Sequence, residues 1–324
     1  MKLRPIDAQA YAREVLPQTA ALWAGRRTFD EYVADVTAVA ESGYGRRHYR
    51  TFGFYDGDSL LASFKRYERN LHVGNARLRA IGIGAVFTPE TLRGRGYASA
   101  MLAGALDLAR ADGYDAAFLF SDIHPAFYEA LGFTALPSRS FSLRADGVPA
   151  NGLRDAGLHV ERLESSDWTG VRRCFELGER TRPWGFVRSP LVWEWVRMRV
   201  EQRFERTRGE IVNLVVRRGR GIAAYVLGVR DLAADAYILD EFGFADAQAA
   251  ALVPSLLRGA AADLHRIVGW LPPAFARERL PRASVRKRSE GIFMAAPLSP
   301  AGKRWLSTAT MSSPGDGIWI TDRI

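Results

Sequence analysis

The stretch LRGRGYASAM, residues 92–101, places two glycines directly before a run with helical periodicity. Small and aliphatic residues recur at three- and four-residue spacing over residues 97–111, and Asp112-Gly113 follows, so we expect a helix between them. Glycines at this point allow a tight turn, and the first N–H groups of a helix have no partners within it. With the helix dipole and the charges of Arg93 and Arg95, they predict a phosphate-binding loop.

The loop does not match two common phosphate-binding motifs. A dinucleotide-binding motif needs a third glycine, as Gly-x-Gly-x-x-Gly, and a P-loop needs Gly-Lys-Ser/Thr. Residues 94–99 read GRGYAS and contain neither. The loop therefore indicates a pyrophosphate site without a Rossmann fold or a Walker ATPase, and a plain glycine-rich turn is the alternative.

The segments around the loop predict an α/β fold. Residues 2–6 predict a strand, and a helical stretch from Asp7 to Trp23 follows it. The remaining elements of this half are a hairpin at residues 50–55 and 59–67, strands at 76–87 and 116–120, and a short helix at 125–131.

Two segments resemble the GCN5-related N-acetyltransferase (GNAT) family. They are GAVFTPETLRGRGYASAMLAGALDLARADGYDAAFLFSD, residues 84–122, and FYEALGF, residues 127–133. The acetyl-CoA motif of the family, Arg/Gln-x-x-Gly-x-Gly/Ala, reads Arg93, Gly96 and Ala98 here. The second segment lies at the usual distance from the first. The resemblance implies a mixed sheet with flanking helices and acyl transfer from acyl-CoA to an amine.

The resemblance also implies roles for individual residues. The loop would hold the CoA pyrophosphate through the amides of Gly94, Arg95, Gly96, Tyr97, Ala98 and Ser99. The backbone of Ala85, Val86 and Phe87 would hold the pantetheine arm and polarise the thioester carbonyl. Tyr128 would protonate the departing thiolate, with packing as its alternative, and Ser121 would be a further cofactor contact.

The general base is not predicted, because residues 81–87 contain no acid. The candidates are Glu41, His48, Asp122 and His124. A further candidate is the terminal carboxylate of Ile324, because the layout is similar to tandem-domain aminoglycoside acetyltransferases of the enhanced-intracellular-survival type, in which that group reaches the site. The alternative for this tail is a final strand at residues 318–320. The motif segments are also similar to fungal lysine N-acetyltransferases.

The second half repeats the order hairpin, strand, helix, strand, at residues 211–229, 235–242, 246–264 and 266–271. Its own Arg-Gly-Arg-Gly, residues 218–221, joins two strand-like runs and predicts a hairpin turn. The equivalent of the first loop, FGFAD at 242–246, lacks the CoA motif, and Asp246 would cap the next helix and repel phosphate.

Residues 142–157 have the composition of a linker. We therefore expect two tandem domains, a catalytic GNAT domain at 1–150 and a degenerate GNAT-like domain without a CoA site at 151–324. Trp184, Trp193 and Trp195 follow this linker, and they predict either core packing or a wall of the acceptor pocket.

Composition narrows the classes of partner. The net charge of +9 comes almost entirely from scattered arginines, without the basic and aromatic stripe of a nucleic-acid track, so no nucleic-acid partner is expected. No apolar run approaches the length of a membrane span and no signal peptide is recognisable, so we expect no membrane partner and a cytoplasmic location. The single cysteine, Cys174, fits a reducing compartment.

The sequence thus predicts an N-acetyltransferase that moves an acetyl group from acetyl-CoA to a primary amine of a small molecule or a side chain. Acetyl-CoA is expected as the cosubstrate, without a metal ion. The alternative is a non-catalytic module that binds CoA and a protein. The acceptor, the base, the oligomeric state and the role of the second domain stay open.

Overall fold

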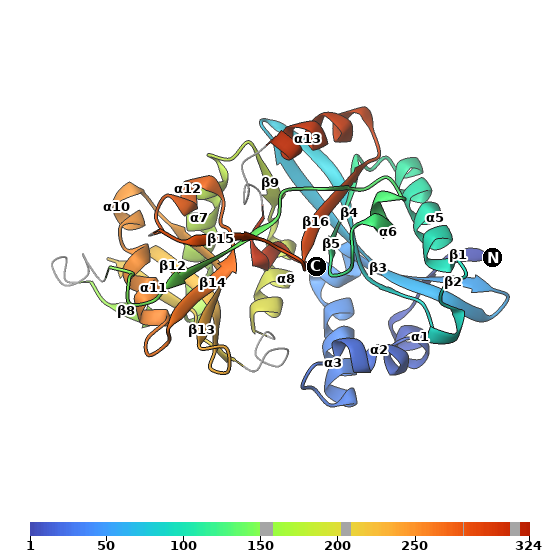
Figure 1. Cartoon of the computed structure of the whole chain (residues 1–324), viewed down its shortest axis with the longest axis horizontal. Helices are drawn as coiled ribbons and strands as arrows, with labels where there is room; N and C mark the ends of the chain where they lie inside the picture. The colour runs from blue at the N-terminus through green and yellow to red at the C-terminus, as the bar shows by residue number, and fades with distance from the viewer. Residues whose placement is uncertain (150–157, 202–208, 281, 312–317) are drawn as a thin grey trace.

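The computed structural model describes residues 1–149, 158–201, 209–280, 282–311 and 318–324. Two mixed sheets of eight strands lie side by side, each flanked by helices (Figure 1). The expected α/β fold with two tandem domains is confirmed. Within the described residues, no helix is both long and apolar enough to cross a membrane.

The first sheet is built mainly from the first half of the chain. Its strands, in spatial order, are β1 (Lys2–Ile6), β2 (Tyr49–Asp56), β3 (Ser59–Val73), β4 (Ala76–Phe87), β5 (Ala116–Ser121), β16 (Ile292–Pro297) and β6 (Thr134–Ala135), and β9 (Trp184–Val187) pairs with β3. Only β4 and β5 pair in parallel. The expected hairpin is formed by β2 and β3, and Gly57 adopts a positive φ of 55° at its turn.

Six helices belong to this half: α1 (Ala8–Glu14), α2 (Leu16–Trp23), α3 (Phe29–Glu41), α4 (Gly43–His48), α5 (Tyr97–Ala111) and α6 (Ala126–Glu129). A short 3-10 turn, η1 (Glu90–Leu92), precedes α5. The side chain of Asp7 caps α1, and Thr28 and Glu31 form a capping box at α3. The apolar face of α5 is buried against the first sheet through Met101 and Leu102.

The second sheet repeats this arrangement. Its order is β15 (Ser284–Lys287), β7 (Arg139–Arg144), β14 (Arg266–Trp270), β13 (Ala236–Phe244), β12 (Gly221–Asp231), β11 (Leu214–Arg218) and β8 (Val160–Arg162), with β10 (Glu210–Ile211) on β12. Its helices are α7 (Trp168–Glu179), α8 (Pro190–Glu201), α10 (Ala247–Ala250), α11 (Val253–Ala260) and α12 (Ala274–Arg277). Helix α13 (Pro300–Met311) packs beside β16 of the first sheet (Figure 1).

Strands cross between the two halves of the chain, and β9 from the second half pairs with β3 of the first sheet. Strand β16 from the second half lies between β5 and β6 of the first sheet, and β7 from the first half lies between β14 and β15 of the second. Residues 142–144, expected in the linker, therefore belong to β7. The division of the chain at residue 150 stays a prediction, since the sheets are completed across it.

The helix expected at residues 246–264 is wrong in its extent. The structure has two shorter helices there, α10 and α11, with a break at Ala251 and Leu252. Pro254 explains the break, because it has no N–H to donate to the carbonyl of Ala250 and continue the first helix.

Candidate functional site

Strands β4 and β5 separate before they end. Their parallel ladder runs from Ala80 and Ala116 to Ile83 and Leu119, and no pairing between them follows. Strand β4 continues beside β3, but with a bulge in its register, and Ala85 in the bulge has a positive φ of 48°. A non-glycine residue in this conformation is strained, and bulges re-aim the backbone beside functional sites. The end of β4 thus presents a backbone edge that β5 does not cover.

The glycine loop connects this edge to α5. Gly94 and Gly96 both have a φ of 78°, and Gly96 is the N-cap of the helix without a side-chain cap. The first helical bond runs from the Ala100 N–H to the Gly96 carbonyl at 3.0 Å. No described residue accepts a hydrogen bond from the amides at positions 97–99. The start of this 15-residue helix therefore offers donors to a ligand, beside the exposed Arg93 and Arg95.

The second Arg-Gly-Arg-Gly forms a hairpin turn, as predicted. Arg218 at the end of β11 pairs with Gly221 at the start of β12, and Gly219 has a φ of 60°. Arg218 forms an ion pair with Asp246, whose side chain also accepts a hydrogen bond from the Ala249 N–H and caps α10. The Ala249 amide, and next Arg218, lower the pKa of Asp246. The helix start that corresponds to α5 is thus already occupied by a carboxylate.

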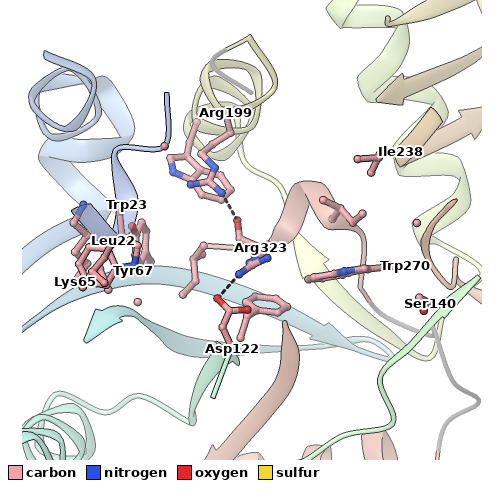
Figure 2. A pocket seen from close by; sticks show the side chains of 18 of the residues that line it. Leu22, Trp23, Lys65, Tyr67, Asp122, Ser140, Arg199, Ile238, Trp270 and Arg323 are labelled. Atoms are coloured by element: carbon pink, nitrogen blue, oxygen red, sulfur yellow. Dashed lines mark hydrogen bonds and ion pairs between the residues drawn. The ribbon is translucent and has the colours of Figure 1, made fainter. Parts of the chain in front are cut away.

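A cleft of about 940 Å³ lies between the two sheets. Figure 2 shows Trp23, Lys65 and Tyr67 on the side of the first sheet, and Ser140 and Trp270 on the side of the second. Gly84 and Ala85, at the bulged end of β4, also line it. The uncovered edge of β4 therefore opens into a space large enough for a small molecule.

The C-terminal segment enters the same cleft. Arg323 forms an ion pair of 2.5 Å with Asp122, and its carbonyl oxygen lies 3.5 Å from Nη2 of Arg199 (Figure 2). Ile324 reaches β4, where its Cδ1 lies too close to Gly82 for a Cβ to fit between them. A side chain at this position would have to displace the end of the Ile324 side chain and the ring of Phe118.

The final strand considered for residues 318–320 is wrong. A 3-10 turn at Ile320–Asp322 replaces it, because the Asp322 carboxylate accepts a hydrogen bond from the Trp319 N–H at 3.2 Å. A side chain that bonds to its own backbone in this way competes with strand pairing.

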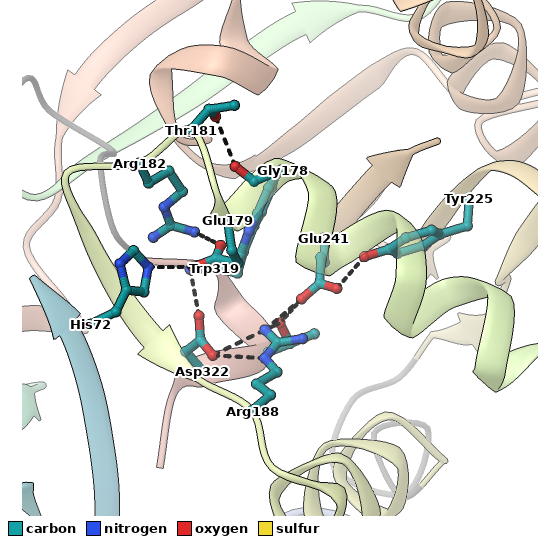
Figure 3. A network of polar contacts seen from close by, with 11 residues as sticks. His72, Gly178, Glu179, Thr181, Arg182, Arg188, Tyr225, Glu241, Trp319 and Asp322 are labelled. Carbon is teal, nitrogen blue, oxygen red and sulfur yellow. Dashed lines mark hydrogen bonds and ion pairs between the residues drawn. The ribbon is translucent and has the colours of Figure 1, made fainter. Parts of the chain in front are cut away.

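A buried ionic network holds this turn between the sheets (Figure 3). Nη2 of Arg188 donates to Glu241 at 2.7 Å, to Thr321 at 2.8 Å and to Asp322 at 3.0 Å, and Tyr225 donates to Glu241 at 2.5 Å. Burial alone would lower the pKa of Arg188, but the carboxylates of Asp322 and Glu241 hold it above its ordinary value. The network ties β13 to the segment that lines the cleft.

Replacing Arg188 by methionine is expected to lower the free energy of unfolding by about 3–5 kcal/mol, because two buried carboxylates lose their cation. Urea denaturation measures this change. The control is Arg197→Met, since the Arg197–Glu201 pair is about half exposed and should be worth at most about 1 kcal/mol. Equal losses in both variants would show that the buried network does not stabilise the fold.

If the chain transfers an acyl group to an amine in this cleft, as the family resemblance implies, a short Gly-Ser extension after Ile324 is expected to lower kcat/KM for the amine by about 100-fold, because the added residues must enter the cleft beside Gly84. Acetyl-CoA affinity and Tm should hold, since the ionic network and the glycine loop are untouched. The same extension before Met1, which is 70% exposed, is the control. Full activity of the C-terminally extended protein would contradict the expectation.

Comparison with known proteins agrees with this geometry. A family model described as acetyltransferase (GNAT) domain matches residues 8–136. The chain carries a GNAT domain. The family resemblance seen in the sequence is confirmed, and the domain supports acyl-CoA-dependent N-acyltransferase activity. No curated protein matches the chain.

Solved structures extend the likeness to both sheets. A GCN5-related N-acetyltransferase from Anabaena variabilis has a TM-score of 0.70 at 13% identity and covers 93% of this chain and 74% of its own. Eis1 from Mycobacterium abscessus has a TM-score of 0.60 at 14% identity, covering 92% and 73%. A tandem GNAT protein from the clavulanic acid biosynthesis pathway has a TM-score of 0.52 at 13% identity, covering 92% and 99%. At these identities the likeness shows the fold, which is that of two tandem GNAT domains.

Tyr128 of the GNAT domain lies on α6, just after β5. Its ring packs against Phe127 and Phe133, with ring centroids 4.9 and 6.0 Å away, and it does not line the interdomain cleft. Burial first, and then the charge of Asp122, raise the pKa of Tyr128 to about 12. The hydroxyl therefore keeps its proton at neutral pH, as a general acid must. Its catalytic role stays a prediction.

Ser121, expected as a further cofactor contact, is buried at the end of β5. Its hydroxyl donates to the Ile123 carbonyl at 2.8 Å and accepts from the Ile123 N–H at 3.3 Å. The contact with the cofactor stays a prediction, and the hydroxyl already has these partners.

Four of the five candidate bases lie in the GNAT domain, and the fifth is the terminal carboxylate of Ile324. Asp122 and Ile324 line the cleft, whereas Glu41, His48 and His124 do not. His48 lies 3.6 Å from Glu68, and His124 Nδ1 accepts a hydrogen bond from the Ala126 N–H. Asp122 also accepts a bond from the Gly291 N–H at 2.9 Å. The structure thus brings two of the five candidates to the bulged end of β4. No cluster of three or more potential metal ligands occurs among the described side chains.

All three tryptophans are buried core residues, which is one of the two expected roles. Trp195 on α8 also lines the cleft, and its role as a wall of the acceptor pocket stays a prediction. Several cleft residues escaped the sequence analysis, among them Tyr67, Arg199, Arg266 and Trp270. Arg199 lies on helix α8, and for the three residues on strands only the alternation within the strand could have indicated a solvent-facing side chain, because the facing domain is set by tertiary structure.

Proposed function

We propose that the chain transfers an acetyl group from acetyl-CoA to a primary amine bound in the interdomain cleft, on a small molecule or a side chain. The observation that carries this proposal is the position of one strand. The bulged end of β4 lines the cleft at Gly84 and Ala85, and the same strand leads into the glycine loop at the start of α5. An acyl donor held by the loop would thus lie along the edge that faces the acceptor.

The residues present fit acetyl-CoA. The amides at positions 97–99 have no acceptor among the described residues, and a Cβ at Gly94 or Gly96 would meet no atom within 4 Å. When bound, acetyl-CoA supplies the reactive thioester. We assign its binding to Ala85, Val86, Phe87, Arg93, Gly94, Arg95, Gly96, Tyr97, Ala98, Ser99 and Ser121.

The protein contributes to the proposed acetyl transfer in three ways. Backbone N–H groups at residues 85–87 polarise the carbonyl where negative charge develops. The transfer forms a nitrogen–carbon bond and breaks the carbon–sulfur bond, and the Tyr128 hydroxyl donates its proton to the sulfur. The amine loses one proton, which Asp122 or Ile324 is placed to receive, since both line the cleft.

We assign the acetyl-CoA site and Tyr128 to residues 1–150, and a structural and acceptor-binding role to residues 151–324, with Ile324 as the one candidate base that this half contributes. Two features support this division of labour. The helix start that corresponds to α5 carries the capping Asp246, which repels phosphate, and β14 and β15 of the second sheet contribute residues to the cleft.

An amine library assayed by release of free CoA thiol, with mass spectrometry of the product, tests the proposal. We expect thiol release that depends on the amine and a product heavier by one acetyl group. Longer acyl-CoA donors in a parallel series test the preference for acetyl. Acetyl-CoA binding without thiol release for any amine would instead favour a non-catalytic module that binds CoA and a protein.

A further inference from the structure

The lining of the interdomain cleft is strongly basic. Its charged side chains are Arg27, Lys65, Arg199, Arg266, Arg286 and Arg323 against Asp35 and Asp122. Both carboxylates already form ion pairs with lining arginines, Asp35 with Arg27 at 2.6 Å and Asp122 with Arg323 at 2.5 Å. The described lining therefore has four more basic than acidic side chains, and the terminal carboxylate of Ile324 offsets only one of these charges.

Part of this charge lies on one regular face of the second sheet. In β7, Ser140, Phe141 and Ser142 all line the cleft, and the Phe141 side chain between the two serines is buried in the core. In the neighbouring strand β15, Arg286 pairs with Ser140 and Ser284 with Ser142. Because side chains of a strand alternate between faces, these hydroxyl groups and the guanidinium group share the face toward the cleft.

Arg266 on β14 extends the same wall. It lines the cleft and donates through Nη2 to the Ala234 carbonyl at 3.0 Å. The other N–H groups of its guanidinium group can donate to a ligand. No described residue accepts a hydrogen bond or forms an ion pair with Arg286, on the exposed strand β15. Guanidinium groups beside hydroxyl groups are the donors that bind carboxylate and phosphate.

The acyl donor does not account for this wall. Residues 93–99 of the glycine loop, which have their own amides and arginines for the CoA pyrophosphate, are absent from the lining of the cleft. The wall belongs to the second sheet, whereas the reacting edge of β4 belongs to the first. A ligand that spans the cleft would thus meet the two sites with different ends.

The excess positive charge also acts on the amine itself. An ammonium group is repelled by like charges, and its neutral form, which is the form that attacks, is favoured. A polycationic amine would be repelled by the basic lining without a compensating attraction, whereas an amine with an anionic group would bind through that group.

We propose that the acceptor carries a carboxylate or phosphate group in addition to its amine, and that Arg286, with Ser140, Ser142 and Ser284, binds this group, while Arg266 adds to the positive charge of the same wall. The inference rests on the proposed function, because it identifies the substrate class of the same site.

The test uses matched pairs of amines that differ in the anionic group. L-lysine is compared with 1,5-diaminopentane, and O-phosphoethanolamine with ethanolamine, so that carboxylate and phosphate are examined separately. Thiol release gives kcat/KM, and calorimetry on the protein saturated with CoA gives binding without turnover. We expect the anionic member of at least one pair to be favoured at least 10-fold in both measurements.

The double variant Arg266→Glu/Arg286→Glu should remove this preference and leave acetyl-CoA affinity unchanged. The control is Arg220→Glu, an exposed arginine in the β11–β12 turn outside the cleft. Turnover of both pairs without preference, or a preference that survives the double variant, would overturn the inference while the proposed function stands. Preferential binding without any turnover would support the inference and contradict the proposed function, and neither binding nor turnover would contradict both.

Discussion

Tyr128→Phe is expected to lower kcat by ~100- to 10,000-fold, the usual range for loss of a general acid, with little change in acetyl-CoA affinity. The ring contacts with Phe127 and Phe133 do not involve the hydroxyl, so the variant should keep the fold of α6. Steady-state kinetics and calorimetry with acetyl-CoA separate the two quantities. Unchanged kcat would assign Tyr128 to packing alone.

A matched control is Tyr11→Phe. The Tyr11 hydroxyl is buried without a hydrogen-bond partner among the described residues, and no step of the proposed transfer uses it, so its removal should leave kcat unchanged. Comparable losses of kcat in the two variants would indicate a general effect of removing a buried hydroxyl.

The pH dependence gives a second readout for Tyr128. Because burial and the charge of Asp122 raise its pKa to about 12, the hydroxyl is protonated through the whole neutral range and loses its proton only as the pH approaches 12. The kcat profile between pH 6 and 10 should therefore have the same shape in the wild type and in Tyr128→Phe, at a lower level in the variant. An alkaline limb below pH 10 that vanishes in the variant would show that the pKa is not raised.

Local signals were sufficient for most of the GNAT domain. The predicted ranges of β4 and α5 match the structure, because a long alternating run and a helical repeat are each bounded by turn residues. The separation of β4 from β5 could not be predicted in the same way. It depends on the bulge at Ala85, and alanine carries no sequence signal for a positive φ.

The residues that line the cleft could not be predicted from the sequence, because tertiary structure brings them together. Strands β7 and β16 each complete the sheet of the other half, and no local pattern states with which sheet a short strand will pair. The tail lies in the cleft because Asp322 is held by Arg188, a contact over 134 positions of sequence. The basic wall likewise exists only once β14 and β15 are placed on either side of β7. Sequence reasoning could therefore predict the glycine loop and the helix that follows it, but not which side chains line the cleft between the sheets.

Gly96→Asp is expected to reduce acetyl-CoA affinity by at least 100-fold. The new carboxylate would stand at the start of α5, next to the bound CoA phosphate groups, which carry the same sign of charge. Two unit charges about 4 Å apart interact with ~1 kcal/mol in water and ~4 kcal/mol near a protein surface, so this repulsion weakens binding. A Cβ at Gly96 meets no protein atom within 4 Å, but the φ of 78° strains any other residue there, so a control with the same backbone strain is needed to assign the loss to the ligand. Isothermal titration calorimetry measures the affinity.

Gly219→Asp is the matched control, because this glycine lies in the second copy of the same tetrapeptide, has a similar positive φ of 60° and also has open space where a Cβ would stand. The affinity of this variant for acetyl-CoA should equal that of the wild type. Gly96→Asn separates charge from shape, since it introduces a side chain of equal size that tolerates the left-handed conformation without a negative charge, and it should lose less affinity than the aspartate. Equal loss at positions 96 and 219, or two CoA molecules bound per chain, would contradict a single site at the first loop. The two copies differ only in what surrounds them: the first opens a helix whose amides are without acceptors among the described residues, and the second joins two strands beside a helix that Asp246 has already capped.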